Sequence, residues 1–235
     1  MGVVYTMTIP PLMQKSNEQN AVVRLKKTYS MLSSAYTLAV SDNGTPDSWG
    51  LSSATAYDSA VALKMMNTIK PYIKIEKDCG NDSAITGCFP NTVYSYKNGA
   101  SWTSWVNINT GGSQFARVRL ADGSSLAAQY TGVNTNCAVS NGPTPALQST
   151  CGIFYVDVDG QNGPSQLGTD LFGFYLTPFG IVPTGTAPET GAGFSNNCIA
   201  GGRWGCTAWV IYNENMDYLK PCGSTLSWTG AHSCN

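Results

Sequence analysis

The chain has few charged side chains and almost no histidine. Its 235 residues include 13 Lys and Arg, 14 Asp and Glu and one His, so charged residues make up 11% of the sequence, against roughly 25% in an average soluble protein. The net charge of −1 provides no basic surface for DNA, RNA or an acidic membrane face. We therefore expect no nucleic-acid partner. Ser, Thr, Asn and Gly take the place of charges, a composition common in proteins that work outside the cell.

The usual signatures of catalysis are also missing. No serine lies in a GxSxG motif, and no glycine-rich phosphate loop stands at a strand–helix junction. The single histidine, His232, lies close to the C-terminal end between Ser227 and Cys234, which is weak support for a Ser-His-Asp triad. No two cysteines form a CxxC pair, so a zinc site is poorly supported. These absences predict a protein that is not an enzyme.

Cysteine, by contrast, is present in an even number and only in the C-terminal two-thirds. The eight positions are Cys79, Cys88, Cys137, Cys151, Cys198, Cys206, Cys222 and Cys234. This pattern predicts four disulfides formed in an oxidising compartment. Short, turn-rich intervals favour the pairs 79–88 and 137–151. For the last four cysteines, 198–206 with 222–234 and 198–234 with 206–222 both stay open.

An export route is expected, but its signal is not visible at the N-terminus. The stretch MGVVYTMTIPPLMQKSNEQN (1–20) has no charged n-region, apolar core and cleavage site. Its apolar part is only about nine residues long, too short to cross a bilayer. We therefore expect either a shortened chain or a start that differs from the natural one.

The N-terminal region has helical periodicity from Gln14 to Asp42. Apolar residues recur in alternating steps of three and four, which places them on one stripe of a helix. The stripe consists of Val22, Leu25, Tyr29, Leu32, Tyr36 and Ala39. Gly44 and Pro46 are expected to end this helix. A second helix is predicted over Ser53–Lys70, with Pro71 as its stop.

Beyond the second helix the sequence changes to short β-rich runs separated by Gly, Asn, Asp and Pro. They are TVYSY (92–96), SWTSWVNI (101–108), FARVRLADGSSLAAQY (115–130), CGIFYVDV (151–158) and FGFYLTPFGIV (172–182). Within the run 115–130, RLADGSSLA (119–127) predicts a hairpin that turns at Asp122-Gly123. The run CTAWVIYNENMDYLK (206–220) fits a strand or a short helix. The predicted fold class is α+β, with a helix over 1–42, whose apolar part is 2–13, and a globular head over 43–235.

Four segments resemble the type IV pilins and the type II secretion pseudopilins. GVVYTMTIPPLMQK (2–15) is similar to the latter half of that family's membrane helix, and VVRLKKTYSMLSSAYTLAVSDNGTPDSWGL (22–51) to its continuation. DVDGQNGPSQLGTDLFGFYL (157–176) and CTAWVIYNENMDYLK (206–220) are also similar to segments of the group. The family's leader peptide, its methylated Phe and the Glu that follows are not present here. The resemblance implies that about a dozen apolar residues precede Gly2, which would complete a run of ~20 that can cross a membrane.

The resemblance implies a pilin-like fold, in which a long N-terminal helix packs on a disulfide-stapled antiparallel sheet. It further implies a non-enzymatic subunit of a type IV pilus or type II secretion pseudopilus. Such a subunit is exported, anchored in the inner membrane before assembly, and then part of a periplasmic or extracellular filament. Its partners would be copies of itself and other pilins of the same machine. Assembly contacts would come from Val3, Val4, Met7, Ile9, Pro10, Leu12, Val22, Leu25, Tyr29, Leu32 and Tyr36.

The run VDVDGQNGPSQLGTD (156–170) offers hard oxygen ligands on a glycine-rich segment. Asp157, Asp159, Asn162 and Asp170, with backbone carbonyls, could hold Ca²⁺, which takes six to eight oxygens. Some major pseudopilins bind calcium in a loop of the sheet domain, so the resemblance adds to this hypothesis. The alternative is a loop of Asx turns, in which aspartates accept hydrogen bonds from nearby amides and Asp170 caps a short segment.

Aromatic residues suggest a second function from another class. Trp102, Trp105, Trp204, Trp209 and Trp228, with tyrosines at 94, 96, 155 and 175, could build a sugar-stacking face or could simply fill the core of a β domain. The alternative function is therefore a secreted calcium-dependent adhesin or carbohydrate-binding module. A secreted hydrolase is a third hypothesis, and it would require carboxylates that converge in one cleft.

Overall fold

A computed structural model of the chain describes residues 3–96, 99–101, 108, 114–188, 193–202 and 204–234, with side chains from Met13 onward. The helices are α1 (Val3–Asn43), α2 (Ser59–Ile69), α3 (Pro145–Gln148) and α4 (Thr207–Asn213). The strands are β1 (Ile75–Gly80), β2 (Phe115–Leu120), β3 (Ser125–Gln129), β4 (Gly152–Asp157), β5 (Leu171–Thr177) and β6 (Gly180–Pro183). The short helical turns are η1 (Pro46–Ser48), η2 (Lys70–Tyr72), η3 (Phe194–Ile199), η4 (Trp204–Cys206), η5 (Asp217–Leu219) and η6 (Pro221–Thr225).

The six strands form one antiparallel sheet in the order of the sequence, β1-β2-β3-β4-β5-β6. The predicted turn at Asp122-Gly123 connects β2 to β3, and the Asp122 carboxylate accepts a hydrogen bond from the Ser124 amide at 3.1 Å. The run 172–182 forms the β5–β6 hairpin. The run 92–96 forms no strand and contributes isolated bridges at Ser95. A long helix with an antiparallel sheet confirms the α+β class.

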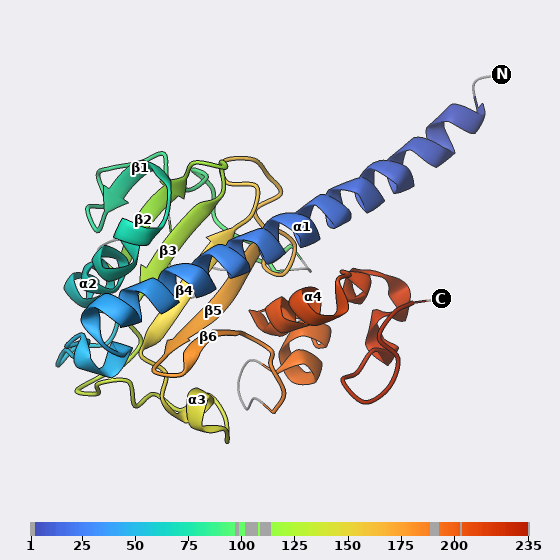
Figure 1. Ribbon diagram of the computed structural model, residues 1–235. Helices are drawn as coiled ribbons and strands as arrows, with labels where there is room; N and C mark the ends of the chain where they lie inside the picture. The colour runs from blue at the N-terminus through green and yellow to red at the C-terminus, as the bar shows by residue number, and fades with distance from the viewer. Residues whose placement is uncertain are drawn as a thin grey trace.

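The helix α1 lies across one face of the sheet and runs beyond it (Figure 1). Its buried positions are Val22, Leu25, Thr28, Leu32, Ala35 and Ala39. Tyr29 and Tyr36 are half-buried at the edge of this stripe. The Tyr29 ring stacks on Phe174 with 5.5 Å between centroids, and the Tyr36 hydroxyl donates to the Pro178 carbonyl oxygen at 2.8 Å. Thr28 and Ala35, which precede these two tyrosines, are the buried residues. Because their side chains are short, the helix can approach the sheet closely.

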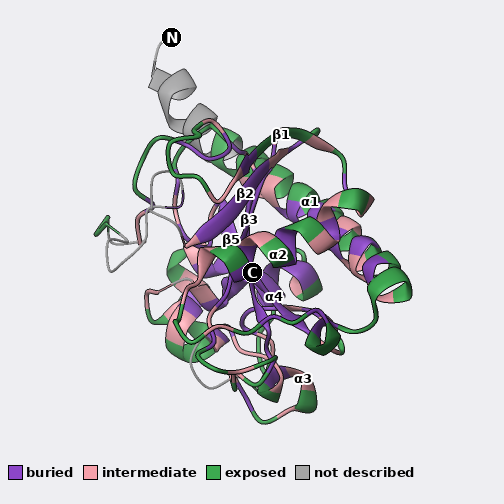
Figure 2. Cartoon of the chain, turned by 90° about the vertical axis from the view of Figure 1, so that its left-hand side faces the viewer, coloured by how far each residue is buried: buried purple, intermediate pink, exposed green. Residues whose placement is uncertain are grey.

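The sheet has a hydrophobic cluster on each face because successive side chains of a strand point to opposite sides. Leu126, Phe154 and Phe174 face α1 and α2, while Ala127 and Tyr155 face the other way. In Figure 2 the strands are mostly buried, and α1 alternates buried and exposed residues along its length. The second face is covered by loops rather than by a long helix.

One element differs from the sequence-based expectation, and a second decides between two alternatives that the sequence left open. The second helix begins at Ser59, not near Ser53, because Asp58 acts as its N-cap: its carboxylate accepts hydrogen bonds from the amides of Ala60 and Val61. The ambiguous run 206–220 contains the helix α4, which ends at Glu214 in a left-handed conformation. None of the helices, over the part of the chain that the structure describes, combines the length and hydrophobicity needed to cross a bilayer.

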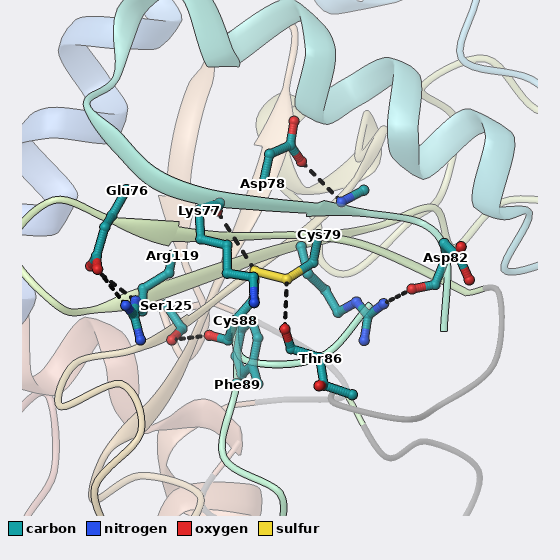
Figure 3. The surroundings of a disulfide bond; sticks show 12 residues. Glu76, Lys77, Asp78, Cys79, Asp82, Thr86, Cys88, Phe89, Arg119 and Ser125 are labelled. Atoms are coloured by element: carbon teal, nitrogen blue, oxygen red, sulfur yellow. Dashed lines mark hydrogen bonds and ion pairs between the residues drawn. A yellow bond between two sulfur atoms is a disulfide. The ribbon is translucent and has the colours of Figure 1, made fainter. Parts of the chain in front are cut away.

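All eight cysteines are paired, which confirms the four predicted disulfides. The pairs are Cys79–Cys88, Cys137–Cys151, Cys198–Cys206 and Cys222–Cys234. The structure thus selects the local pairing of the last four cysteines. Around the first pair, the Ser125 hydroxyl donates to the Cys88 carbonyl oxygen, and Arg119 forms an ion pair with Glu76 on β1 (Figure 3). The disulfide therefore closes the loop after β1, and the Ser125 hydrogen bond holds that loop against β3.

Candidate functional site

The aspartate loop, defined as residues 157–170, connects β4 to β5. Its two ends are joined by a hydrogen bond from the Val158 amide to the Asp170 carbonyl oxygen at 2.9 Å. Gly160 adopts a left-handed conformation, and a Cβ there would lie 1.9 Å from the Gly123 carbonyl oxygen. Only glycine allows this contact between the loop and the β2–β3 turn. The loop is therefore closed at its base and packed against the β2–β3 turn.

Asp157 is completely buried at the end of β4 and accepts three hydrogen bonds. Its Oδ1 accepts from the amides of Asp159, at 3.2 Å, and Gly160, at 2.8 Å. The Tyr94 hydroxyl donates to its Oδ2. This is an Asx turn with an additional tyrosine donor, as the alternative interpretation of the sequence predicts.

Asp170 holds the other end of the loop. Its Oδ1 accepts a hydrogen bond from the Gln166 amide at 2.8 Å, and its Oδ2 accepts from the Ser165 amide. Asn162 lies between the two ends, and its side-chain amide donates to the Asp159 carbonyl oxygen at 2.9 Å. Each of these contacts organises the loop backbone.

The three carboxyl groups share one poorly solvated region. Burial is the main cause that raises the pKa of Asp157 well above its ordinary value, and the neighbouring Asp159 and Asp170 add to this. Burial also raises the pKa of Asp159, although Arg24 opposes the shift. Burial raises the pKa of Asp170 to about 7. Each of these carboxyl groups is therefore harder to ionise than an exposed aspartate.

A groove of about 870 Å³ separates this loop from α1. Its helix wall consists of Met13, Gln14, Asn17, Glu18, Asn20, Ala21 and Arg24. Its loop wall includes Asp159, Asn162 and Asp170, and Met216 and Leu219 contribute from the C-terminal region. The guanidinium of Arg24 crosses the groove and donates to the Val158 carbonyl oxygen at 3.0 Å. The wall from α1, including Arg24, was not foreseen, because its residues lie more than a hundred positions from the loop in the sequence.

The geometry favours hydrogen bonding over metal binding for the aspartate loop. Within the described residues, no group of three or more His, Cys, Asp and Glu side chains is arranged to hold a metal ion. Of the predicted ligands, Asp159, Asn162 and Asp170 line the groove, whereas Asp157 does not. Calcium binding by these residues stays a prediction.

The remaining predicted residues are those whose side chains lie outside the described part of the structure and the aromatic residues that the structure describes. Val3, Val4, Met7, Ile9, Pro10 and Leu12 belong to the first turns of α1, and their side chains lie outside the described part of the structure. Trp102 and Trp105 also lie outside the described residues. Tyr94, Tyr155, Tyr175 and Trp209 are buried, and Tyr96, Trp204 and Trp228 are half-buried. Core packing thus accounts for four of these rings.

Comparison with known proteins identifies one relationship. The model of a family of unknown function, DUF6613, matches residues 11–183. No curated protein and no solved structure matches the chain. The matched range includes most of α1, the aspartate loop, the whole sheet and every residue that lines the groove except Met216 and Leu219.

Proposed function

We propose that this chain, which belongs to the DUF6613 family of unknown function, is a structural, non-enzymatic subunit of an extracellular filament of the type IV pilus or type II secretion pseudopilus kind. The observation that carries the proposal is the length of α1. Its 41 residues correspond to about 60 Å at 1.5 Å per residue. The buried stripe from Val22 to Ala39 accounts for less than half of that length.

The N-terminal part of α1 supports an assembly role because the head does not require it for packing. From Met13 to Asn20 every described side chain is exposed except Glu18, which is half-buried. A helix that extends past its own domain can pack against equivalent helices of other subunits, and head-to-tail contacts that do not close generate a helical polymer. The four disulfides are consistent with an exported protein and therefore with this role.

Burial against the sheet of the same chain removes some of the predicted residues from the set that can contact another subunit. Leu25 and Leu32 are fully buried against the sheet of their own chain, so head packing accounts for both. Contacts between subunits would come from residues before Val22 and from apolar residues on the outer side of α1. Among the latter, Val23 is 66% exposed and Leu38 is 51% exposed.

The processing of the N-terminus tests the proposal most directly. We expect protein purified from its own cells to begin with a methylated residue upstream of Gly2, as in processed pilins. Mass spectrometry of the N-terminal peptide measures this. An N-terminus produced by an ordinary signal peptidase would contradict the filament function and favour a secreted protein.

Replacing Val23 with Asp is expected to reduce the amount of filament by roughly tenfold or more, because a carboxylate in an apolar helix contact loses its hydration without a partner. The thermal stability of the head should change little, since Val23 is largely exposed. Electron microscopy and quantification of sheared surface filaments measure the effect in full-length protein.

The matched control is Ser140→Asp, which adds the same carboxylate to an exposed position in a loop of the head and not on α1. It should leave filaments at the wild-type level. Normal filaments with Val23→Asp would show that this side of α1 is not an assembly surface.

The alternative function, a secreted carbohydrate-binding module, is favoured by one separate observation. Half-buried aromatic residues and the buried amide of Gln129 line a pocket on the sheet face that α1 does not cover. A binding site there is compatible with either a filament subunit or a secreted protein.

A further inference from the structure

A second pocket, of about 360 Å³, lies on the face of the sheet opposite to α1. Its floor comes from Gln129 on β3 and from Ile153 and Tyr155 on β4. Gln129 and Ile153 are direct partners across the two strands. All three residues point away from Leu126 and Phe154, which face the helices. The volume is at the lower end of the range for small-molecule sites, about 300–1,000 Å³.

Aromatic rings form much of the rim. Tyr57, Tyr96 and Trp204 all line the pocket and are half-buried, so part of each remains accessible. The Trp204 ring packs on Tyr155 with 4.8 Å between centroids. It fits against β5 because residue 173 is glycine, where a Cβ would lie 2.8 Å from the Trp204 ring. Tyr57 has a positive φ of 60°, a costly conformation for a bulky residue that is more frequent at functional sites.

Two buried polar atoms at this pocket lack a hydrogen-bond partner in the fold. Gln129 is fully buried, and its Oε1 accepts from the Tyr155 hydroxyl at 2.8 Å, but its Nε2 has no partner. The Oγ1 of Thr131 is also buried and without a partner. Such groups are rare in folded proteins because each costs free energy. Both residues line the pocket, and a ligand that brings its own hydroxyl groups would satisfy them.

The chemistry of the lining defines the class of ligand. Among the described residues that line the pocket, none carries a charge, so nothing there would compensate a phosphate or a carboxylate. Aromatic faces bind flat apolar surfaces, and amides and hydroxyls both donate and accept. A neutral pyranose combines an apolar C–H face with a rim of hydroxyl groups. We propose that this pocket binds a neutral saccharide unit, with the ring against Trp204 and hydroxyls bonded to Gln129 and Thr131.

This inference does not depend on the filament function, since the pocket belongs to the head alone. The test uses D-glucose, D-galactose, D-mannose and N-acetyl-D-glucosamine, each titrated into the isotopically labelled protein. The indole N–H signal of Trp204 in the two-dimensional NMR spectrum reports binding. At least one sugar should shift it saturably, with a dissociation constant on the order of 1 mM, as expected for a ligand of this size.

The decisive variant is Thr131→Val, which removes a hydroxyl that has no partner in the fold. It should weaken sugar binding about five- to tenfold and leave the melting temperature unchanged or slightly higher. The matched control is Thr135→Val, because the Oγ1 of Thr135 is equally buried and unpartnered but Thr135 does not line the pocket. Thr135→Val should bind as the wild type does.

Three results would overturn the proposal. One is the absence of a saturable shift with all four sugars. Another is wild-type binding by Thr131→Val, which would place any bound sugar elsewhere. The third is an equal loss of binding in Thr131→Val and Thr135→Val, which would indicate a general effect on the fold.

Discussion

Leu32→Ala is expected to lower the free energy of unfolding by about 2–5 kcal/mol. The Leu32 side chain is fully buried between α1 and the sheet. Its truncation therefore removes apolar contact and leaves a cavity that a close-packed core fills only in part. Urea unfolding followed by circular dichroism and tryptophan fluorescence measures the change.

Leu38→Ala is the matched control for this prediction. It is the same substitution on the same helix, two turns closer to the end of α1, but Leu38 is 51% exposed. We expect it to change the free energy of unfolding by no more than about 0.5 kcal/mol. Equal effects of the two substitutions would contradict the docking of α1 on the sheet.

The aspartate loop is expected to make the chain less stable as the pH rises from about 4 to about 7. An aspartate in the unfolded chain has a pKa of about 3.9, whereas burial raises the pKa of Asp170 to about 7 in the folded chain. Between these values the folded state binds more protons than the unfolded state, so the free energy of unfolding falls with rising pH. The contribution is complete at the acidic end of this window and is lost as the pH passes through 7.

Asp170→Asn should flatten this part of the pH profile, because asparagine keeps the size of the side chain and does not ionise. The difference between the pKa of Asp170 in the folded chain, about 7, and that of an unfolded aspartate corresponds to at most about 4 kcal/mol. The groups that face Asp170 are Asp157, Asp159 and Tyr94, and their own titration leaves a residual slope. Thermal melts over the same pH series measure both variants, and Asp47→Asn at an exposed position outside the loop is the control.

The same experiment tests calcium binding by Asp159, Asn162 and Asp170. A bound calcium ion favours ionised carboxylates, so added calcium would raise the melting temperature at neutral pH and a chelator would lower it. No response to either would exclude the calcium site. If the wild type without calcium instead becomes more stable as the pH rises, and Asp170→Asn abolishes this rise, Asp170 is ionised in the folded chain.

Local physical signals made much of the fold predictable from the sequence. The three-four spacing of Val22, Leu25 and Leu32 identified the buried side of α1, and Asp122-Gly123 identified the β2–β3 turn. The short intervals between cysteines gave the first two disulfides. What these features share is that their partners are near in sequence or repeat with a fixed period.

Long-range geometry was not predictable. Nothing local indicates that Arg24 reaches Val158, or that the ring of Trp204 fits against Gly173. Thr28, and not the predicted Tyr29, is the buried residue at this point of the stripe, and the Tyr29 ring stacks on Phe174 instead. This arrangement depends on how closely the helix approaches the sheet. The face of the sheet that carries the second pocket could be inferred only once the register of β3 and β4 was known.

The placement of the disulfides has a mechanical consequence. Each joins residues only 8 to 14 positions apart, and all of them lie after α2. No cross-link among them ties α1 to the sheet. Tension applied to the N-terminal end of α1 would therefore load only non-covalent packing, and the helix would peel from the sheet while the stapled loops stayed closed. Separation of α1 from the sheet would lengthen the molecule, whereas the loops closed by the four disulfides would keep their covalent connections.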